Sequence, residues 1–138
     1  HHVYSFSPAK PFELRLYSGQ PEQPIAFPQQ GVVVLGCNIH DAMVGYIYVA
    51  ASSQVAQSDS EGRGEIPLPQ AVDAKVTLGV WHPQQTLGPE RLNRISLDAP
   101  DLDAQATRLS DGTLVLSVAV AAPASRDTFQ ARFRASQK

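Results

Sequence analysis

The sequence has a single cysteine, Cys37, so no disulfide can form within the chain. Disulfide content therefore gives no information about the compartment in which the protein works. A lone cysteine is most often a small buried side chain, and in a suitable setting it is a metal ligand. Its neighbours in the sequence must decide between these two interpretations.

Charge and long apolar runs are also scarce. Charged residues make up 17% of the chain, the formal net charge is −2, and no basic stripe is present, which argues against a nucleic-acid partner. The apolar runs are too short for a membrane span. The chain does not open with a signal peptide, as expected also of a processed, exported protein. A hydrophobic fraction of 43% favours a folded chain over a disordered one.

Helical periodicity is lacking, and 11 prolines and 9 glycines divide the chain into short segments. Several segments alternate apolar and polar residues or carry β-branched runs, and an Asp-Gly pair flanked by such runs predicts a hairpin. We therefore predict an all-β fold of eight or nine strands. The expected strands span residues 1–7, 12–17, 31–36, 44–51, 74–83, 94–98, two arms within 107–120, and 128–135.

The stretch "GCNIHDAM" joins two of these expected strands and contains the chain's only cysteine and only methionine. Cys37, His40 and Met43 are spaced C-x2-H-x2-M, so a thiolate, an imidazole and a thioether can face one ion. These soft ligands suit copper, whereas calcium and magnesium prefer oxygen. Spacing alone leaves a second interpretation equally open, in which Cys37 and Met43 are core residues.

The run "GVVVLGCNIHDAMVGYIYV" resembles the last ligand loop of the cupredoxins, the plastocyanin and amicyanin group. The start "HHVYSF" is similar to the strand that carries their upstream ligand histidine, which aligns with His1. The later "SDSEGRGEIPLP…VTLGVWHP" resembles a carboxypeptidase-regulatory-like β-sandwich. This combination is similar to bacterial plastocyanin-like proteins, some labelled methylamine utilization proteins.

The resemblance implies a cupredoxin-like Greek-key sandwich portion in residues 1–51, followed by an accessory Ig-like or regulatory-like β-sandwich in residues 52–138. It implies one copper ion, cycling between Cu+ and Cu2+, held by His1, Cys37 and His40 in a plane with Met43 as a weak axial ligand. The implied function is single-electron transfer between transient redox protein partners in the periplasm or another exported location, without enzymatic activity.

The sequence departs from the cupredoxin pattern at two points. Gly36 stands where an aromatic residue often precedes the ligand cysteine. Cupredoxins also have several strands before the first ligand histidine, whereas this sequence begins there. We expect a missing N-terminal segment or a partner chain to complete the fold, because an incomplete sheet exposes its edges.

Other functions remain open on the sequence. His1 could form an N-terminal histidine brace with His2, His40 or His82, which would leave the cysteine unused. The chain could instead be a copper-binding carrier, or a structural module that has lost its metal.

His82 is better explained as a strand-end residue packed on an aromatic ring. His2 either bonds the ligand loop or faces solvent, and Asp41 is expected to be solvated. Without a Gly-x-Ser-x-Gly motif, Ser5 and Ser7 do not indicate a hydrolase.

Overall fold

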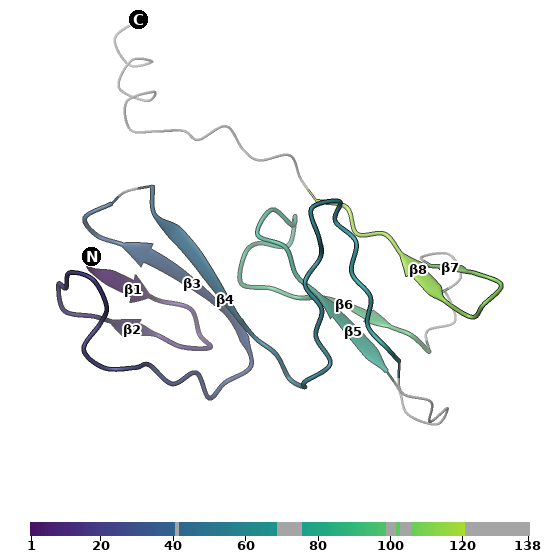
Figure 1. Ribbon diagram of the computed structural model, residues 1–138, viewed down its shortest axis with the longest axis horizontal. Helices are drawn as coiled ribbons and strands as arrows, with labels where there is room; N and C mark the ends of the chain where they lie inside the picture. Colours follow the sequence, from purple (N-terminus) through teal and green to yellow (C-terminus); the bar gives the residue numbers. More distant parts are fainter. Residues whose placement is uncertain (41, 69–75, 99–101, 103–105, 121–138) are drawn as a thin grey trace, which may run out of the picture.

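The computed structural model describes residues 1–40, 42–68, 76–98, 102 and 106–120, and this part of the chain is essentially all-β. Its strands form three antiparallel sheets that follow one another across the molecule (Figure 1). The prediction of an all-β protein is confirmed. The strands are β1 (Val3–Ser5), β2 (Phe12–Glu13), β3 (Gly31–Cys37), β4 (Val44–Val49), β5 (Thr77–Val80), β6 (Asn93–Ser96), β7 (Ala106–Arg108) and β8 (Leu114–Leu116).

The largest sheet has the order β2-β1-β3-β4, so β1 and β3 occupy its centre although 25 residues separate them. β3 is the β-branched run expected to be buried, and Val32 and Val33 are 2% and 0% exposed. β1 pairs with the end of β3 by placing Val3 opposite Cys37. Residues that precede β1 therefore lie beside residues that follow β3, and the N-terminus lies next to the tip of β3 (Figure 1).

The predicted strand 12–17 pairs with β1 and the residues before it over more than the two residues of β2. Its regular pairing is interrupted between Leu14 and Tyr17. The Leu14 N–H donates to the Val3 carbonyl at 2.9 Å, in register with β2, whereas Tyr17 and His1 exchange backbone hydrogen bonds one residue out of register. One extra residue is thus inserted, as in a β-bulge. Phe12 and Leu14 are half-buried, whereas Leu16, which strict alternation would place on their face, is 69% exposed.

The remaining strands form two hairpin-like pairs, β5 with β6 and β7 with β8. The Asp-Gly hairpin is confirmed, because β7 and β8 pair across Asp111 and Gly112. Gly112 has φ of +89°, which only glycine adopts without strain, and Asp111 accepts the Thr113 N–H at 2.9 Å. The expected strand 128–135 lies outside the described residues. Nowhere in the described ranges is there a helix long and apolar enough to cross a membrane.

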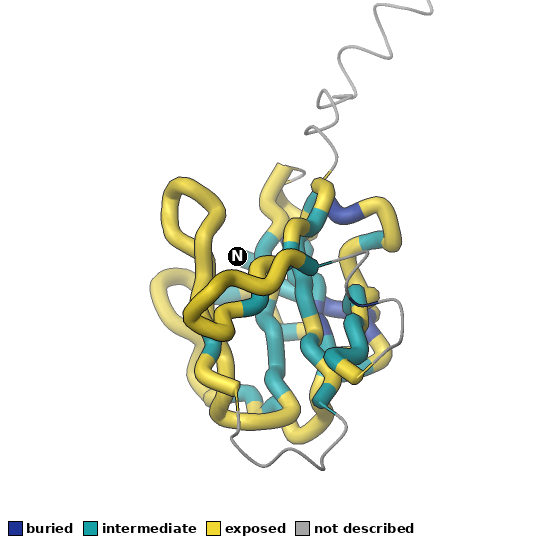
Figure 2. Tube along the Cα trace, turned by 90° about the vertical axis from the view of Figure 1, so that its right-hand side faces the viewer, coloured by how far each residue is buried: buried dark blue, intermediate teal, exposed yellow. Residues whose placement is uncertain are grey.

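Side-chain contacts connect the first sheet with the segment that follows β5. The Ser7 hydroxyl, 1% exposed, donates to Glu90 Oε1 at 2.5 Å and accepts the Val34 N–H at 2.9 Å. The ring of Tyr46 on β4 lies 5.2 Å from the ring of Trp81. Most of the described residues are exposed or half-buried (Figure 2).

We predict that Ser7→Ala destabilises the fold. The change removes the acceptor of the partly buried Val34 amide and the donor to Glu90, so it should lower the free energy of unfolding by about 1–3 kcal/mol. Urea denaturation would measure this loss, with the exposed Ser53→Ala as the control. Equal unfolding free energies for the two variants would show that the Ser7 contacts do not stabilise the protein.

Candidate metal centre

The loop between β3 and β4 consists of short turns that follow Cys37. The His40 N–H donates to the Cys37 carbonyl at 3.3 Å, and the Met43 N–H donates to the His40 carbonyl at 2.8 Å. Such turns reverse the chain within three residues, which brings side chains three positions apart to the same side. As predicted, the loop joins two paired strands, and it returns the imidazole of His40 to the sulfur of Cys37.

Three of the predicted ligands form a cluster. The Cys37 sulfur lies 3.4 Å from Nδ1 of His40 and 4.0 Å from Nδ1 of His1. One ligand atom from each of the three residues lies within 4.8 Å of the others, so the cluster could hold a metal ion. Cys37 is buried, His1 is half-buried and His40 is exposed, which leaves the cluster open to solvent on the loop side.

The distances within the cluster fit a single first-row metal ion. Thiolate and imidazole ligands lie about 2.0–2.3 Å from such an ion, so two of them separated by 110–120° are roughly 3.5–3.8 Å apart. The two sulfur-to-nitrogen distances, 3.4 and 4.0 Å, bracket this range. A metal could therefore be accommodated by small side-chain rotations, without rearrangement of the strands.

Hydrogen bonds to the sulfur favour its ionised form. Burial raises the pKa of Cys37, but the amides of His2 and Ile39 and the hydrogen bond and positive charge of His40 lower it by more, so the pKa falls from 9.0 to about 7. The His2 N–H is 3.4 Å from the sulfur. A thiolate is the form that binds metals, so these contacts prepare the side chain for an ion.

The sheet and the bulge fix the position of His1. The amino group of His1 donates to the Tyr17 carbonyl at 2.6 Å, and the Tyr17 N–H donates to the His1 carbonyl at 2.9 Å. The His1 ring lies between the Tyr17 ring, at 5.8 Å, and the His40 ring, at 5.0 Å, measured between centroids. The inserted residue is what brings Tyr17 level with His1, so the bulge supports this side of the cluster.

The other residues considered from the sequence lie as follows. Met43 comes three residues after His40, and its side chain is 44% exposed. His82 Nδ1 accepts the Gln84 N–H at 3.1 Å, a local turn contact that accounts for its position. His2 does bond the ligand loop, because its Nδ1 is 3.1 Å from the side-chain nitrogen of Asn38. Asp41 lies outside the described residues.

The glycine before the ligand cysteine is covered by an aromatic ring from the neighbouring strand. Tyr4 is the cross-strand partner of Gly36, and a Cβ placed on Gly36 would be 2.7 Å from the Tyr4 ring. Such packing of an aromatic ring over a cross-strand glycine is a known stabilising arrangement in sheets. Tyr4 therefore leaves no room for a larger side chain at position 36.

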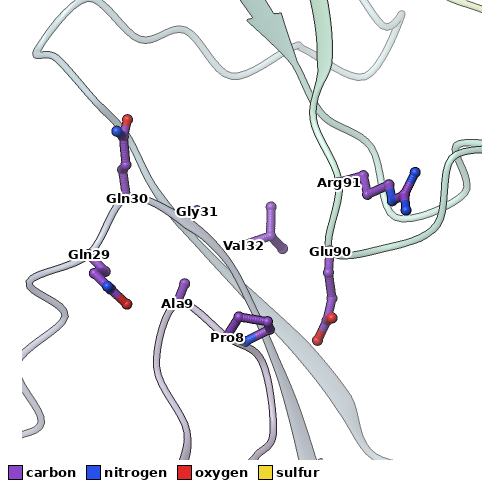
Figure 3. A pocket seen from close by; sticks show the side chains of 8 residues that line it. All are labelled: Pro8, Ala9, Gln29, Gln30, Gly31, Val32, Glu90 and Arg91. Atoms are coloured by element: carbon purple, nitrogen blue, oxygen red, sulfur yellow. The ribbon is translucent and has the colours of Figure 1, made fainter.

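A shallow groove of about 610 Å³ opens at the opposite end of β3 (Figure 3). Its position at Gly31 and Val32 is roughly 20 Å along the strand from Cys37, so it is separate from the cluster. The Glu90 carboxylate at its rim is already hydrogen-bonded to Ser7. The groove is lined by Pro8, Ala9, Gln29, Gln30, Gly31, Val32, Glu90 and Arg91.

Sequence reasoning missed Glu13, Tyr17 and Asn38, which contact the residues around the sulfur. The alternating pattern of residues 12–17 did place Glu13 on the polar face, but it could not name a partner across the sheet. No family model matches the chain, and neither a curated protein nor a solved structure does. The centre is therefore argued from its own geometry.

We predict that the Cys37 thiol of the metal-free protein titrates near pH 7. Its ultraviolet thiolate absorption should rise with a midpoint of about 7 and not 9.0, because the donors around the sulfur stabilise the anion. Since the folded protein has the lower pKa, this stabilisation of the fold is present above pH 9.0 and is lost as the pH falls through about 7.

His40→Ala should move this midpoint upward, because it removes both a hydrogen bond and a positive charge. His82→Ala is the matched control, as it removes a histidine outside the cluster. A midpoint near 9.0 in the unmodified protein would contradict the assignment of these donors to the sulfur.

Proposed function

We propose that this chain carries a type-1 copper centre and transfers single electrons between redox partners. The observation that supports this most is the convergence of one thiol and two imidazoles, with the Cys37 sulfur 3.4 and 4.0 Å from two ring nitrogens. Two histidines and a cysteine are the donor set of blue-copper sites, which also have a weak axial methionine. Met43 is the proposed axial donor.

Copper bound there would supply a one-electron couple between Cu+ and Cu2+. The residues of this chain supply the rigidity that such a couple requires, because little movement between the two states means a low barrier to transfer. Cys37 lies at the end of a central strand, and His1 is held by paired hydrogen bonds to Tyr17. His1 and Cys37 thus rest on the sheet, whereas His40 and the proposed axial donor Met43 lie on the loop.

The surface around His40 supports a brief contact with a protein partner. His40 is exposed, and Ile39, Met43 and Val44 beside it are 54%, 44% and 56% exposed. An apolar rim around an exposed imidazole excludes water on contact without requiring a large interface, as in weak redox encounters. Electrons would enter or leave the centre through the edge of His40.

We also propose that residues 1–51 are the ligand-bearing part of a cupredoxin-like sandwich in an exported protein. All four strands of the first sheet lie in this range, and its central pair carries the first ligand before β1 and the next at the end of β3. Its two edge strands, β2 and β4, are where the remaining strands of a sandwich would be added. Residues 52–138 would form the accessory part.

The histidine brace is the weaker alternative for this cluster. A brace would bind copper through the amino group and imidazole of His1 and through a second imidazole. It would leave the sulfur, the most buried donor of the cluster, without a role. The copper carrier has the same donor set as the electron carrier, so redox behaviour and not geometry distinguishes the two.

We predict that the copper-loaded protein is intensely blue and that Cys37→Ser abolishes the colour. The absorption arises from charge transfer between a thiolate and Cu2+, which a hydroxyl cannot replace. Visible spectra with elemental analysis would measure colour and copper content together, with His82→Gln as the control. One copper per chain in a colourless protein would contradict a bond to sulfur and favour a brace.

We predict that Met43→Leu keeps the blue colour and raises the reduction potential. A weak axial thioether stabilises Cu2+ more than Cu+, so replacing it with hydrocarbon favours the reduced state. Voltammetry of both proteins would measure the difference, and Leu109→Met, at an exposed position in the turn between β7 and β8, would serve as a control. An unchanged potential would remove Met43 from the ligand set. Slow electron self-exchange in the unmodified protein would instead indicate a copper carrier.

A further inference from the structure

A hydrogen-bonded chain of three side chains lies on the face of the sheet opposite the cluster. His2 Nε2 is 2.7 Å from Oε1 of Glu13 on β2, and His2 Nδ1 is 3.1 Å from the side-chain nitrogen of Asn38 in the ligand loop. Side chains alternate between the two faces of a strand, so His2 faces away from His1 and Cys37. None of the three is a proposed ligand.

The two contacts of the His2 ring determine one another. A carboxylate only accepts hydrogen bonds, so Glu13 requires a proton on Nε2 of His2. The neutral ring then presents the lone pair of Nδ1 to the amide hydrogens of Asn38. Glu13 on an edge strand thereby sets the orientation of a side chain in the ligand loop, through the imidazole between them.

The backbone of the same two residues reaches the sulfur. The Asn38 N–H donates to the His2 carbonyl at 3.1 Å, which continues the pairing of β1 with β3. In a continued ladder the His2 N–H would face the Asn38 carbonyl. Here it is directed at the Cys37 sulfur instead, at a distance of 3.4 Å.

We propose that Glu13, His2 and Asn38 form a positioning clamp that holds the His2 amide on the metal-binding sulfur. The inference rests on the proposed function, and it adds residues that tune the centre without binding the metal. The clamp holds His2 and Asn38 together in two ways. Their side chains are joined on one face of the sheet, and their backbones are joined by the bond from the Asn38 N–H to the His2 carbonyl. The His2 N–H therefore stays aimed at the sulfur and not at the loop carbonyl.

The clamp acts by geometry more than by its own binding energy. The side chains of His2 and Glu13 are 28% and 60% exposed, and ion pairs at such sites add little stability. An N–H bond to a ligand sulfur, by contrast, withdraws electron density from it and raises the reduction potential of the copper. Release of the clamp should therefore lower the potential while leaving overall stability nearly unchanged.

The test compares Glu13→Ala, Glu13→Gln and the exposed control Glu65→Ala in the full chain. In the copper-free protein, Glu13→Ala should speed amide exchange at His2 and Asn38 by about three- to tenfold, since one weak contact is lost, with no change at Val33 in the core. In the copper-loaded protein it should lower the potential and shift the charge-transfer band. Glu13→Gln keeps an acceptor oxygen, so its amide exchange rates and reduction potential should stay close to those of the unmodified protein.

The outcomes separate the clamp from the function on which it rests. If the unmodified protein forms no thiolate–copper band, the proposed function fails, and amide exchange still tests the clamp. If the band forms but Glu13→Ala matches Glu65→Ala in potential and exchange, the clamp is overturned. Faster exchange throughout the protein, with an unchanged potential, would make Glu13 a general structural residue and would also overturn it.

Discussion

The antiparallel pairing of β1 with β3 is the constraint on which the metal cluster depends. It sets Val3 opposite Cys37 and Tyr4 opposite Gly36, so His1 and Cys37 share one face of the sheet. A slip of one residue would exchange the two faces and place His2, in the position of His1, next to the sulfur. Burial of Val33 and packing of Tyr4 over Gly36 both oppose such a slip. The register, more than any single ligand, therefore defines the site.

The cluster combines a protected sulfur with an accessible imidazole, and this asymmetry follows from the strand and the loop. Cys37 is the last residue of a central strand and is 5% exposed, whereas His40 is carried back to it by turns at the surface. A buried thiolate is shielded from oxidants, while an exposed imidazole edge permits contact with a partner. The buried sulfur lies at the end of the strand, and the exposed imidazole lies in the loop that follows it.

Part of this arrangement could be predicted from the sequence. The alternating and β-branched runs indicated the strands, the Asp-Gly pair indicated a hairpin, and the spacing of Cys37 and His40 indicated one site. His1 was connected with Cys37 only through a resemblance, and otherwise entered as part of a histidine brace, because no local pattern links it with residue 37. The bulge that exposes Leu16 and the contacts of Glu13 could not be predicted, since both depend on register across strands. Tyr4 filling the space at Gly36 is a contact of the same kind.

Burial and hydrogen bonding have opposite effects on the pKa of Cys37, which explains why several donors surround its sulfur. Burial alone would keep Cys37 protonated and unable to bind a cation, so amides and His40 must compensate. The same amides then draw electron density from the thiolate once an ion is bound, which weakens its donation to the oxidised metal. With copper bound as proposed, these donors would therefore raise its reduction potential.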